Sequence, residues 1–498
     1  MQRKFLKNLA LLLVLNLLIK PFWIFGIDRT VQNTVGAEEY GFYFAIFNFS
    51  FLFYILLDFG ITTFNNKNIA QNSHLLQKHL SNIIVLKLLL FIVYLVFTFF
   101  AAFVIKYSRE QLYLLAFLGL NQFIISFILY LRSNLGGLHL FRTDSFISVL
   151  DRSLMIFICA ILLWGNIVPQ FKIEYFVYAQ TVSLSLTALI TMIIVFRKAD
   201  TQFLKLSWSM PFFLMMLRQS FPFAILVLLM TFYNRIDSVM LERMLEEGAM
   251  YSGIYASAYR LLDAANMIAY LFAVLLLPIF ARMLKQNESI EELIKLSYTL
   301  IITPAIIIAV ASFFYSEEFM RLLYSLHEGE SIIEYEYRIM HSSRVFGILM
   351  ASFCAISTMY IFSTLLTANS KLKYLNFIAL TGMIVNIGLN LLLIPSYQAF
   401  GSAVATLVTQ FLIAGVQVLV VYKLFKFRIN YRLIFKIVVF ISGVLILGYF
   451  SKHTQLDWYI TFLLFVIFSL LLALSIRLIS LRYIYGVLKY GEKHQNTM

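Results

Sequence analysis

The sequence predicts an all-α integral membrane protein with about fourteen transmembrane helices, arranged as two six-helix repeats followed by two C-terminal helices. Of the 498 residues, 61% are hydrophobic and 13% are charged, and the mean hydropathy is +0.86. Apolar runs of about 20 residues, the length that crosses a bilayer, recur along the whole chain. Lysine and arginine collect in alternate connections between these runs, which is the pattern expected of loops on the cytoplasmic side.

A window of about 19 residues places the spans in order. The first follows a basic stretch as in a signal peptide, but no cleavage site of small residues follows it, so we expect a retained helix. The expected spans lie near 8–27, 41–63, 82–105, 111–132, 146–165, 173–196, 217–241, 251–280, 297–315, 343–367, 373–394, 400–422, 433–450 and 458–479.

The charges of the connections support this count. One side, with both termini, holds about 26 basic against about 7 acidic residues, and the other holds about 9 against about 15. We therefore expect both termini in the cytoplasm. The net charge of +14 is mostly a topology signal, and nucleic acid is not an expected partner.

A repeat connects the two halves. The stretch "EEYGFYFAIF", with Gly41 and Tyr43, resembles "AMYSGIYASAY", with Gly253 and Tyr255, and the spacing equals six spans. Parallel six-helix repeats with a substrate cavity between them are a recurrent plan of transporters. We expect an N-terminal lobe at 1–200, a C-terminal lobe at 201–423, and two additional helices with a cytoplasmic tail at 424–498.

Three stretches resemble a known family. They are "VGAEEYGFYFAIFNFSFLFYILLDFGITTFNNKNIAQ", "FPFAILVLLMTFYNRIDSVMLERML" and "MIVNIGLNLLLIPSYQAFGSAVATLVTQ". Together they resemble the polysaccharide-export flippases of the multidrug/oligosaccharidyl-lipid/polysaccharide exporter superfamily. Lys67 stands where that family often has arginine, and Gln398 where it has glycine.

The resemblance implies a flippase that moves an undecaprenyl-diphosphate-linked oligosaccharide across the bacterial inner membrane by alternating access, for cell-surface polysaccharides such as O-antigen. The alternatives are a lipid II flippase and, outside the transporters, a membrane glycan polymerase or ligase. Glycan polymerase or ligase proteins are possible partners, together with membrane lipid. The last two helices resemble those that form a groove for the lipid tail in lipid II flippases.

Charged residues inside spans are costly, so they are candidates for the site. Lys20, Arg235 and Arg260 lie at similar depth, roughly 10 to 14 Å below the outer boundary. Cations at one depth suit a diphosphate, which arginine can bind with two parallel hydrogen bonds. The remaining candidate cations are Lys67 and Lys87. Lys87 lies at a depth similar to that of Asp58, near the inner side, so these two residues could form a pair. The alternatives are that Arg235–Asp263 or Arg260–Asp237 are interhelical ion pairs, and that Lys20 extends to the interface.

The acids of the spans are candidates for coupling to a proton or sodium gradient: Asp58, Asp237 and Asp263. Permanent pairing with Lys87, Arg235 or Arg260 is the alternative. Asn386 and Asn390 share a helix face and are expected either to form interhelical hydrogen bonds or to contact sugar.

No enzyme motif is found. All seven histidines fall in expected loops or the tail, and the sequence shows no zinc spacing, phosphate-binding glycine loop or nucleophile elbow. We therefore expect a transporter with no metal centre, no cofactor and no catalytic residue.

Overall fold

A computed structural model of the chain describes residues 14–478, apart from 17, 63, 64, 67, 68, 70–74, 139, 166 and 200–209. In this part of the chain every regular element is a helix. The elements are η1 (Trp23–Asp28), α2 (Arg29–Leu52), η2 (Tyr54–Leu57), α4 (Leu75–Val104), α5 (Arg109–Gly137), α6 (Phe141–Trp164), α7 (Ile173–Ala199), α8 (Met210–Met244), α9 (Gly248–Lys285), α10 (Glu291–Phe314), α11 (Ser316–Leu323), α12 (Ile332–Ala368), α13 (Leu372–Phe425), α14 (Tyr431–Lys452) and α15 (Trp458–Ser475).

The predicted fold class is confirmed. Within the described residues, eleven helices are long and apolar enough to cross a membrane. One of them, α13, spans 54 residues and breaks at Gln398, where the backbone turns to φ 46° and ψ −131°. It therefore supplies the two expected spans 373–394 and 400–422. Helix α2 is likewise two helices that meet at Gly36, where the backbone turns to φ 81° and ψ 172°. The helix before Gly36 corresponds to the first expected span and the helix after it to the second, in agreement with about fourteen crossings.

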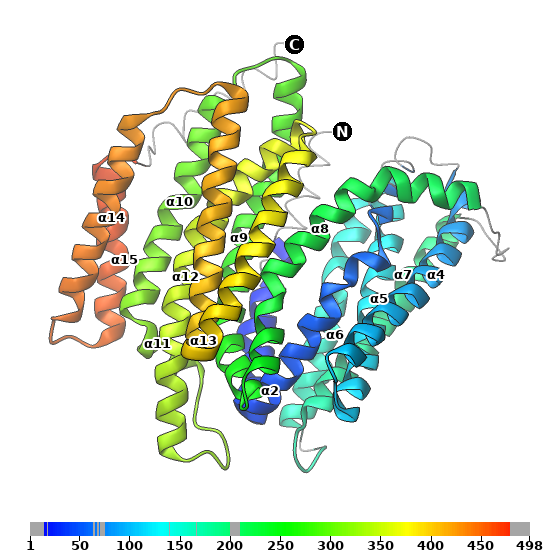
Figure 1. Cartoon of the computed structure of the whole chain (residues 1–498), viewed down its shortest axis with the longest axis horizontal. Helices are drawn as coiled ribbons and strands as arrows, with labels where there is room; N and C mark the ends of the chain where they lie inside the picture. Colours follow the sequence, from blue (N-terminus) through cyan, green and yellow to red (C-terminus); the bar gives the residue numbers. More distant parts are fainter. Residues whose placement is uncertain are drawn as a thin grey trace.

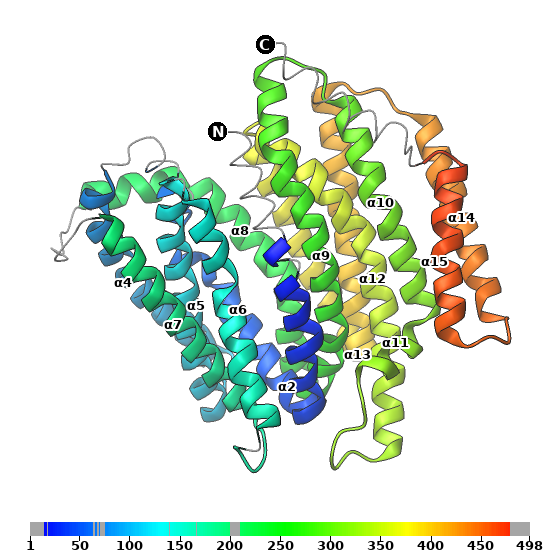
Figure 2. The ribbon, with the colours of Figure 1, turned by 180° about the vertical axis from the view of Figure 1, so that it is seen from behind.

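The helices gather in two bundles (Figure 1). Helices α4 to α7 form one bundle, and α9, α10, α12 and α13 form the other. Helix α8 runs obliquely from the upper end of the first bundle to the lower end of the second, and α14 and α15 lie at the outer edge of the second. The same arrangement is visible from behind (Figure 2). The exact lobe boundaries at 200 and 423 stay predictions.

The ends of the bundles differ in charge. Connections at the lower end of Figure 1 carry acids such as Glu317, Glu328 and Glu330. The connection from α13 to α14, at the upper end, carries Lys426 and Arg428. This alternation agrees with the separation of charge expected from the sequence.

The expected span 41–63 was wrong at its end. Helix α2 stops at Leu52, and a short 3₁₀ helix follows to Leu57. Unwinding inside a membrane frees backbone carbonyl groups, which are tolerated only where other polar groups bond to them. Here the Leu57 carbonyl oxygen accepts hydrogen bonds from Lys87 Nζ at 2.9 Å and Ser126 Oγ at 3.0 Å.

Candidate functional site

The two lobes meet where α2 crosses α9, at the two glycines that the repeat aligned. A Cβ atom on Gly41 would lie 1.9 Å from the Ala249 carbonyl oxygen, and one on Gly253 would lie 1.9 Å from the Ala37 carbonyl oxygen. The backbones are thus in direct contact, which only glycine permits at this separation. This close approach brings the charged residues of α9 next to those at the start of α2.

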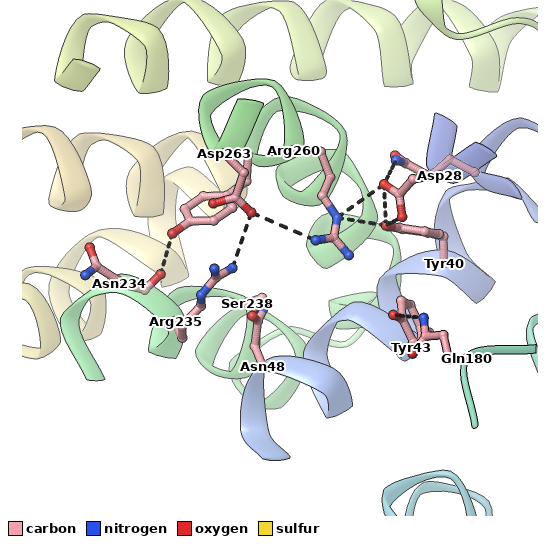
Figure 3. A network of polar contacts seen from close by, with 12 residues as sticks. Asp28, Tyr40, Tyr43, Asn48, Gln180, Asn234, Arg235, Ser238, Arg260 and Asp263 are labelled. Carbon is pink, nitrogen blue, oxygen red and sulfur yellow. Dashed lines mark hydrogen bonds and ion pairs between the residues drawn. The ribbon is translucent and has the colours of Figure 1, made fainter. Parts of the chain in front are cut away.

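Arg260 of α9 faces a carboxylate that the sequence analysis did not include. Its Nε lies 3.3 Å from Asp28 Oδ2 and donates to the Tyr40 hydroxyl at 3.0 Å. The same hydroxyl donates to Asp28 Oδ1 at 2.9 Å. Asp28 is buried and stands one residue beyond the expected end of the first span. Figure 3 shows this part of the network.

Asp263 connects the two arginines. Its Oδ2 lies 3.4 Å from Arg235 Nη1 and 3.9 Å from Arg260 Nη1. Both guanidinium groups also lie over aromatic rings, Arg235 over Tyr259 at 5.4 Å and Arg260 over Phe44 at 5.0 Å. The Arg235–Asp263 ion pair, which the sequence analysis gave as the alternative to a free cation site, is therefore present (Figure 3).

The charge of this cluster corrects the expected cation excess. Arg235 and Arg260 are balanced by Asp28 and Asp263, so the four residues are neutral together. The side chains of Arg235 and Asp263 are each 21% exposed and that of Arg260 is 16% exposed. A ligand can thus reach the arginines, but it has to compete with two carboxylates.

Asp237, on the same helix as Arg235, lies in a separate and buried polar set. Its carboxylate accepts hydrogen bonds from Tyr255 at 2.7 Å, Thr406 at 2.6 Å, Asn390 at 2.7 Å and Asn386 at 3.2 Å. These donors come from α9 and from both halves of α13.

This set decides two predictions. The suggested Arg260–Asp237 pair is wrong, because Arg260 instead pairs with Asp28 and Asp263. The interhelical hydrogen bonds expected of Asn386 and Asn390 are confirmed. A sugar does not reach either amide in this conformation, since both residues are 0% exposed.

Lys20 does not join the arginines of α8 and α9 but lines a cavity of about 740 Å³. Arg132 of α5 lines the same cavity, and Asn16, one turn before Lys20, donates to Ser148 of α6 at 3.1 Å. Ser148 and Arg152 are four residues apart on α6 and therefore share a face of that helix. The opposite wall is apolar and comes from α9, α10, α11, α12 and α15.

The acids near this cavity are already engaged. Arg132 Nε lies 2.7 Å from Asp144 Oδ1, and Arg152 Nε lies 3.6 Å from Asp151 Oδ2. Lys20 forms no ion pair with a described acid. It is therefore the cation of this cavity that remains available to an anionic ligand.

Lys87 and Asp58 form the pair that their depth suggested. Lys87 Nζ bonds to the Asp58 carboxylate and to Ser126 Oγ, the latter at 2.8 Å. The expectation that Lys87 lines the substrate cavity is not met in this conformation, because its side chain is 0% exposed. Lys67 lies outside the described residues. Within those residues no group of three or more histidine, cysteine or acidic side chains could hold a metal ion.

Comparison with known proteins places this arrangement in a family. A family model described as "Polysaccharide biosynthesis protein" matches residues 5–284. The chain belongs to this family. The predicted resemblance to polysaccharide exporters of the flippase type is thereby confirmed. No curated protein matches the chain.

Solved structures share the fold of this family member. "Lipid II flippase MurJ, inward closed conformation" has a TM-score of 0.72 at 14% identity, over 97% of this chain and 99% of that one. An inward-facing multidrug resistance MATE family transporter of the MOP superfamily has a TM-score of 0.60 at 15% identity, over 80% and 92%. A MOP superfamily transporter from Pyrococcus furiosus has a TM-score of 0.55 at 16% identity, over 83% and 94%.

Charged residues of this polysaccharide biosynthesis family member were missed from the sequence, among them Arg132, the last residue of the expected span 111–132. Asp151 and Arg152 stand inside the expected span 146–165, and their presence there was a sufficient signal to include them. Asp28 fell just outside the expected first span, so a margin of a few residues at the span ends would have found it.

Proposed function

We propose that this protein is a flippase that moves an undecaprenyl-diphosphate-linked oligosaccharide from the cytoplasmic to the outer leaflet of the bacterial inner membrane. The observation that carries the proposal is the cavity at Lys20, which joins cations on one wall to an apolar surface on the other. A ligand that fits both walls is an amphiphile with an anionic head. A lipid diphosphate has this chemistry.

The diphosphate would first meet Lys20, which has no ion-pair partner among the described acids. Arg132 and Arg152 stand next to it and can bind further phosphate oxygens, because arginine offers several donors in one plane. Each already has a carboxylate partner, so binding exchanges one anion for another and leaves no arginine unpaired.

Arg235 and Arg260 would act at a second position, on α8 and α9, outside the lining of the Lys20 cavity. Asp28 and Asp263 neutralise them in this conformation. A diphosphate that displaced either carboxylate would change the contacts between α2, α8 and α9. Such an exchange is a physical route from substrate binding to rearrangement of the two lobes.

The polyprenyl tail would lie along the apolar wall, where Phe319 of α11, Phe346 of α12 and Phe462 of α15 face the same cavity. The last helix thus contributes to the tail path, as the family resemblance implied. The sugars would occupy the space between the lobes, since lipid cannot solvate them.

Asp237 is the best of the three acids for coupling to an ion gradient. Asp58 pairs with Lys87 and Asp263 with arginines, whereas Asp237 has four neutral hydrogen-bond donors and no cation partner among the described residues. A buried carboxylate without a cation is costly in a membrane. Binding a proton or a sodium ion would remove that cost, and the surrounding amide and hydroxyl oxygens could supply ligands to sodium.

Lipid II remains the alternative substrate, since it also carries a diphosphate on a polyprenyl tail. A polymerase or ligase is less well supported. Such an enzyme would need a long connection outside the membrane, and the connection between α11 and α12 spans only residues 324–331. Competition between the two lipids in the same vesicles separates the first two candidates: faster movement of lipid II would overturn the oligosaccharide assignment.

The function is tested by translocation of a fluorescent lipid-linked oligosaccharide in proteoliposomes. Lys20→Gln should lower the rate about tenfold or more, since a hydrogen bond to a charged group contributes about 1.5–3 kcal/mol. Lys20→Arg should retain most activity. Lys373→Gln, an equal charge change at the exposed start of α13, is the control. Normal transport by well-folded Lys20→Gln protein would contradict the proposal.

The orientation is tested by cysteine labelling from each side of the membrane. We expect residues 426–430 to react from the cytoplasm and residues 324–331 from outside. Labelling of both segments from the same side would refute the fourteen-span topology.

A further inference from the structure

A second groove lies at the upper end of the C-terminal bundle, between α10, α13 and α14. It has a volume of about 440 Å³ and shares no lining residue with the Lys20 cavity. Phe362 of α12 also lines it. The groove is thus a separate site, lined in part by α14, the first of the two additional helices. Figure 2 shows where α14 lies relative to α10.

The walls of this groove are apolar and open to lipid. Leu419 of α13 is 70% exposed and Ile434 of α14 is 51% exposed. Leu433 and Ile437 continue the wall along α14. In a bilayer, acyl chains cover such surfaces, because no side chain of the described residues fills them.

One end of the groove is polar and carries two cations. Lys295 comes from α10 and Arg428 from the connection between α13 and α14. Neither forms an ion pair with a described acid, whereas Arg132, Arg338 and other arginines do. Glu291 lines the same end, so the lining has a net charge of +1.

A polar amide completes this end. Asn430 uses its Oδ1 to accept the Leu433 N–H at 3.0 Å, which holds the start of α14 in place. The amide nitrogen of Asn430 carries two further N–H donors in the lining of the groove. Cations and a donor at the headgroup level, above an apolar groove, fit one class of ligand.

We propose that this groove binds an anionic phospholipid of the surrounding leaflet. The phosphodiester would accept hydrogen bonds from Arg428 and Lys295, and one acyl chain would lie against Leu419 and Leu433. A zwitterionic lipid would fit the walls but bring its own cation toward the two basic residues. The bound lipid would bridge α14 to α10 and α13, independently of what the protein transports.

Binding is measured by native mass spectrometry of the purified full-length protein with phosphatidylglycerol and with phosphatidylcholine of the same chains. We expect preferential retention of phosphatidylglycerol. The double variant Lys295→Gln/Arg428→Gln should weaken its binding about 30-fold, since each basic residue near an anionic surface contributes about 1 kcal/mol and 1.4 kcal/mol is tenfold.

Two further variants separate a defined site from diffuse attraction. Lys285→Gln/Lys373→Gln removes the same charge at the same end of the molecule, outside the groove, and should bind as the wild type does. Leu419→Trp keeps the charge but fills the groove, and should also lose the lipid.

Three results would overturn the proposal: equal retention of the two lipids, equal loss in the control variant, or full binding by Leu419→Trp. Melting temperatures in detergent without lipid identify any variant that fails to fold. If the double variant fails in this way, Leu419→Trp and the single variant Arg428→Gln decide.

Discussion

Arg235 Nη1 and Asp263 Oδ2 lie 3.4 Å apart and join α8 to α9, the first two helices of the second repeat. The pair holds α8 against α9 and has Arg260 as a third member at 3.9 Å. Its side chains are about one-fifth exposed, so the same arginine is both a structural partner and accessible to ligand. Mutations can separate the two roles.

Arg235→Gln should lower the melting temperature, because Asp263 then keeps only its longer contact with Arg260. The expected loss is about 1–3 kcal/mol, less than the ~3–5 kcal/mol of a fully buried pair. Arg235→Gln/Asp263→Asn should restore stability. If the double variant also restores transport, the arginine is structural only and does not bind the diphosphate.

The contact between Gly41 and Gly253 predicts a large effect of adding one methyl group. Gly253→Ala should cost more than about 3 kcal/mol, because the new Cβ overlaps the Ala37 carbonyl oxygen and the helices have to separate. Gly415→Ala, where nothing lies within 4 Å, is the matched control and should be neutral or stabilising. Protein abundance and melting temperature are the measurements; equal behaviour of the two variants would contradict the close crossing.

Asp237→Asn should abolish the dependence of transport on a proton or sodium gradient while leaving the fold intact, since an amide can still bond to Tyr255 and Thr406. Asp58→Asn should instead unfold the protein more easily, by about 3–5 kcal/mol, because it leaves the buried Lys87 charge without a partner. Transport in vesicles with and without each gradient is the measurement. Unchanged gradient dependence in Asp237→Asn would exclude this carboxylate as the carrier.

The outer connection 324–331 should loosen in acid. Burial alone would raise the pKa of Glu330, but hydrogen bonds from Arg338 and from the His327 backbone N–H outweigh it and hold that pKa below the usual 4.5. Glu330 therefore contributes its full stability above about pH 4.5, and the contribution is lost as the pH falls through the lowered pKa. The connection would then separate from α2. In the structure the two are in contact, since His327 Nδ1 of the connection lies 3.2 Å from the carbonyl oxygen of Asn33 in α2.

Spin labels at Thr34→Cys and Glu328→Cys report this movement as a distance. We expect a narrow distribution at pH 7 and a broader one near pH 4. In Glu330→Gln the distribution should be broad at both values. A narrow distribution of the wild type at both pH values would show that Glu330 does not hold the connection.

Much of the fold could be predicted from the sequence, because hydropathy and charge asymmetry act locally along the chain. They predicted the spans on either side of Gln398 and the opposite charges of the two ends. Helical rise also gave the depth of each charged residue, which was enough to suggest the pairs Asp58–Lys87 and Arg235–Asp263.

The sequence by itself thus determined the fold class, the alternating charge of the connections and the depth of the intramembrane charges. Only the tertiary structure decided which of them are neighbours. Lys20 and Arg235 have similar depth but face different surroundings, and Asp237 gathers its donors from two other helices. The physical reason is that depth fixes one coordinate, whereas the rotation of each helix and its lateral neighbours follow from packing such as the Gly41–Gly253 crossing.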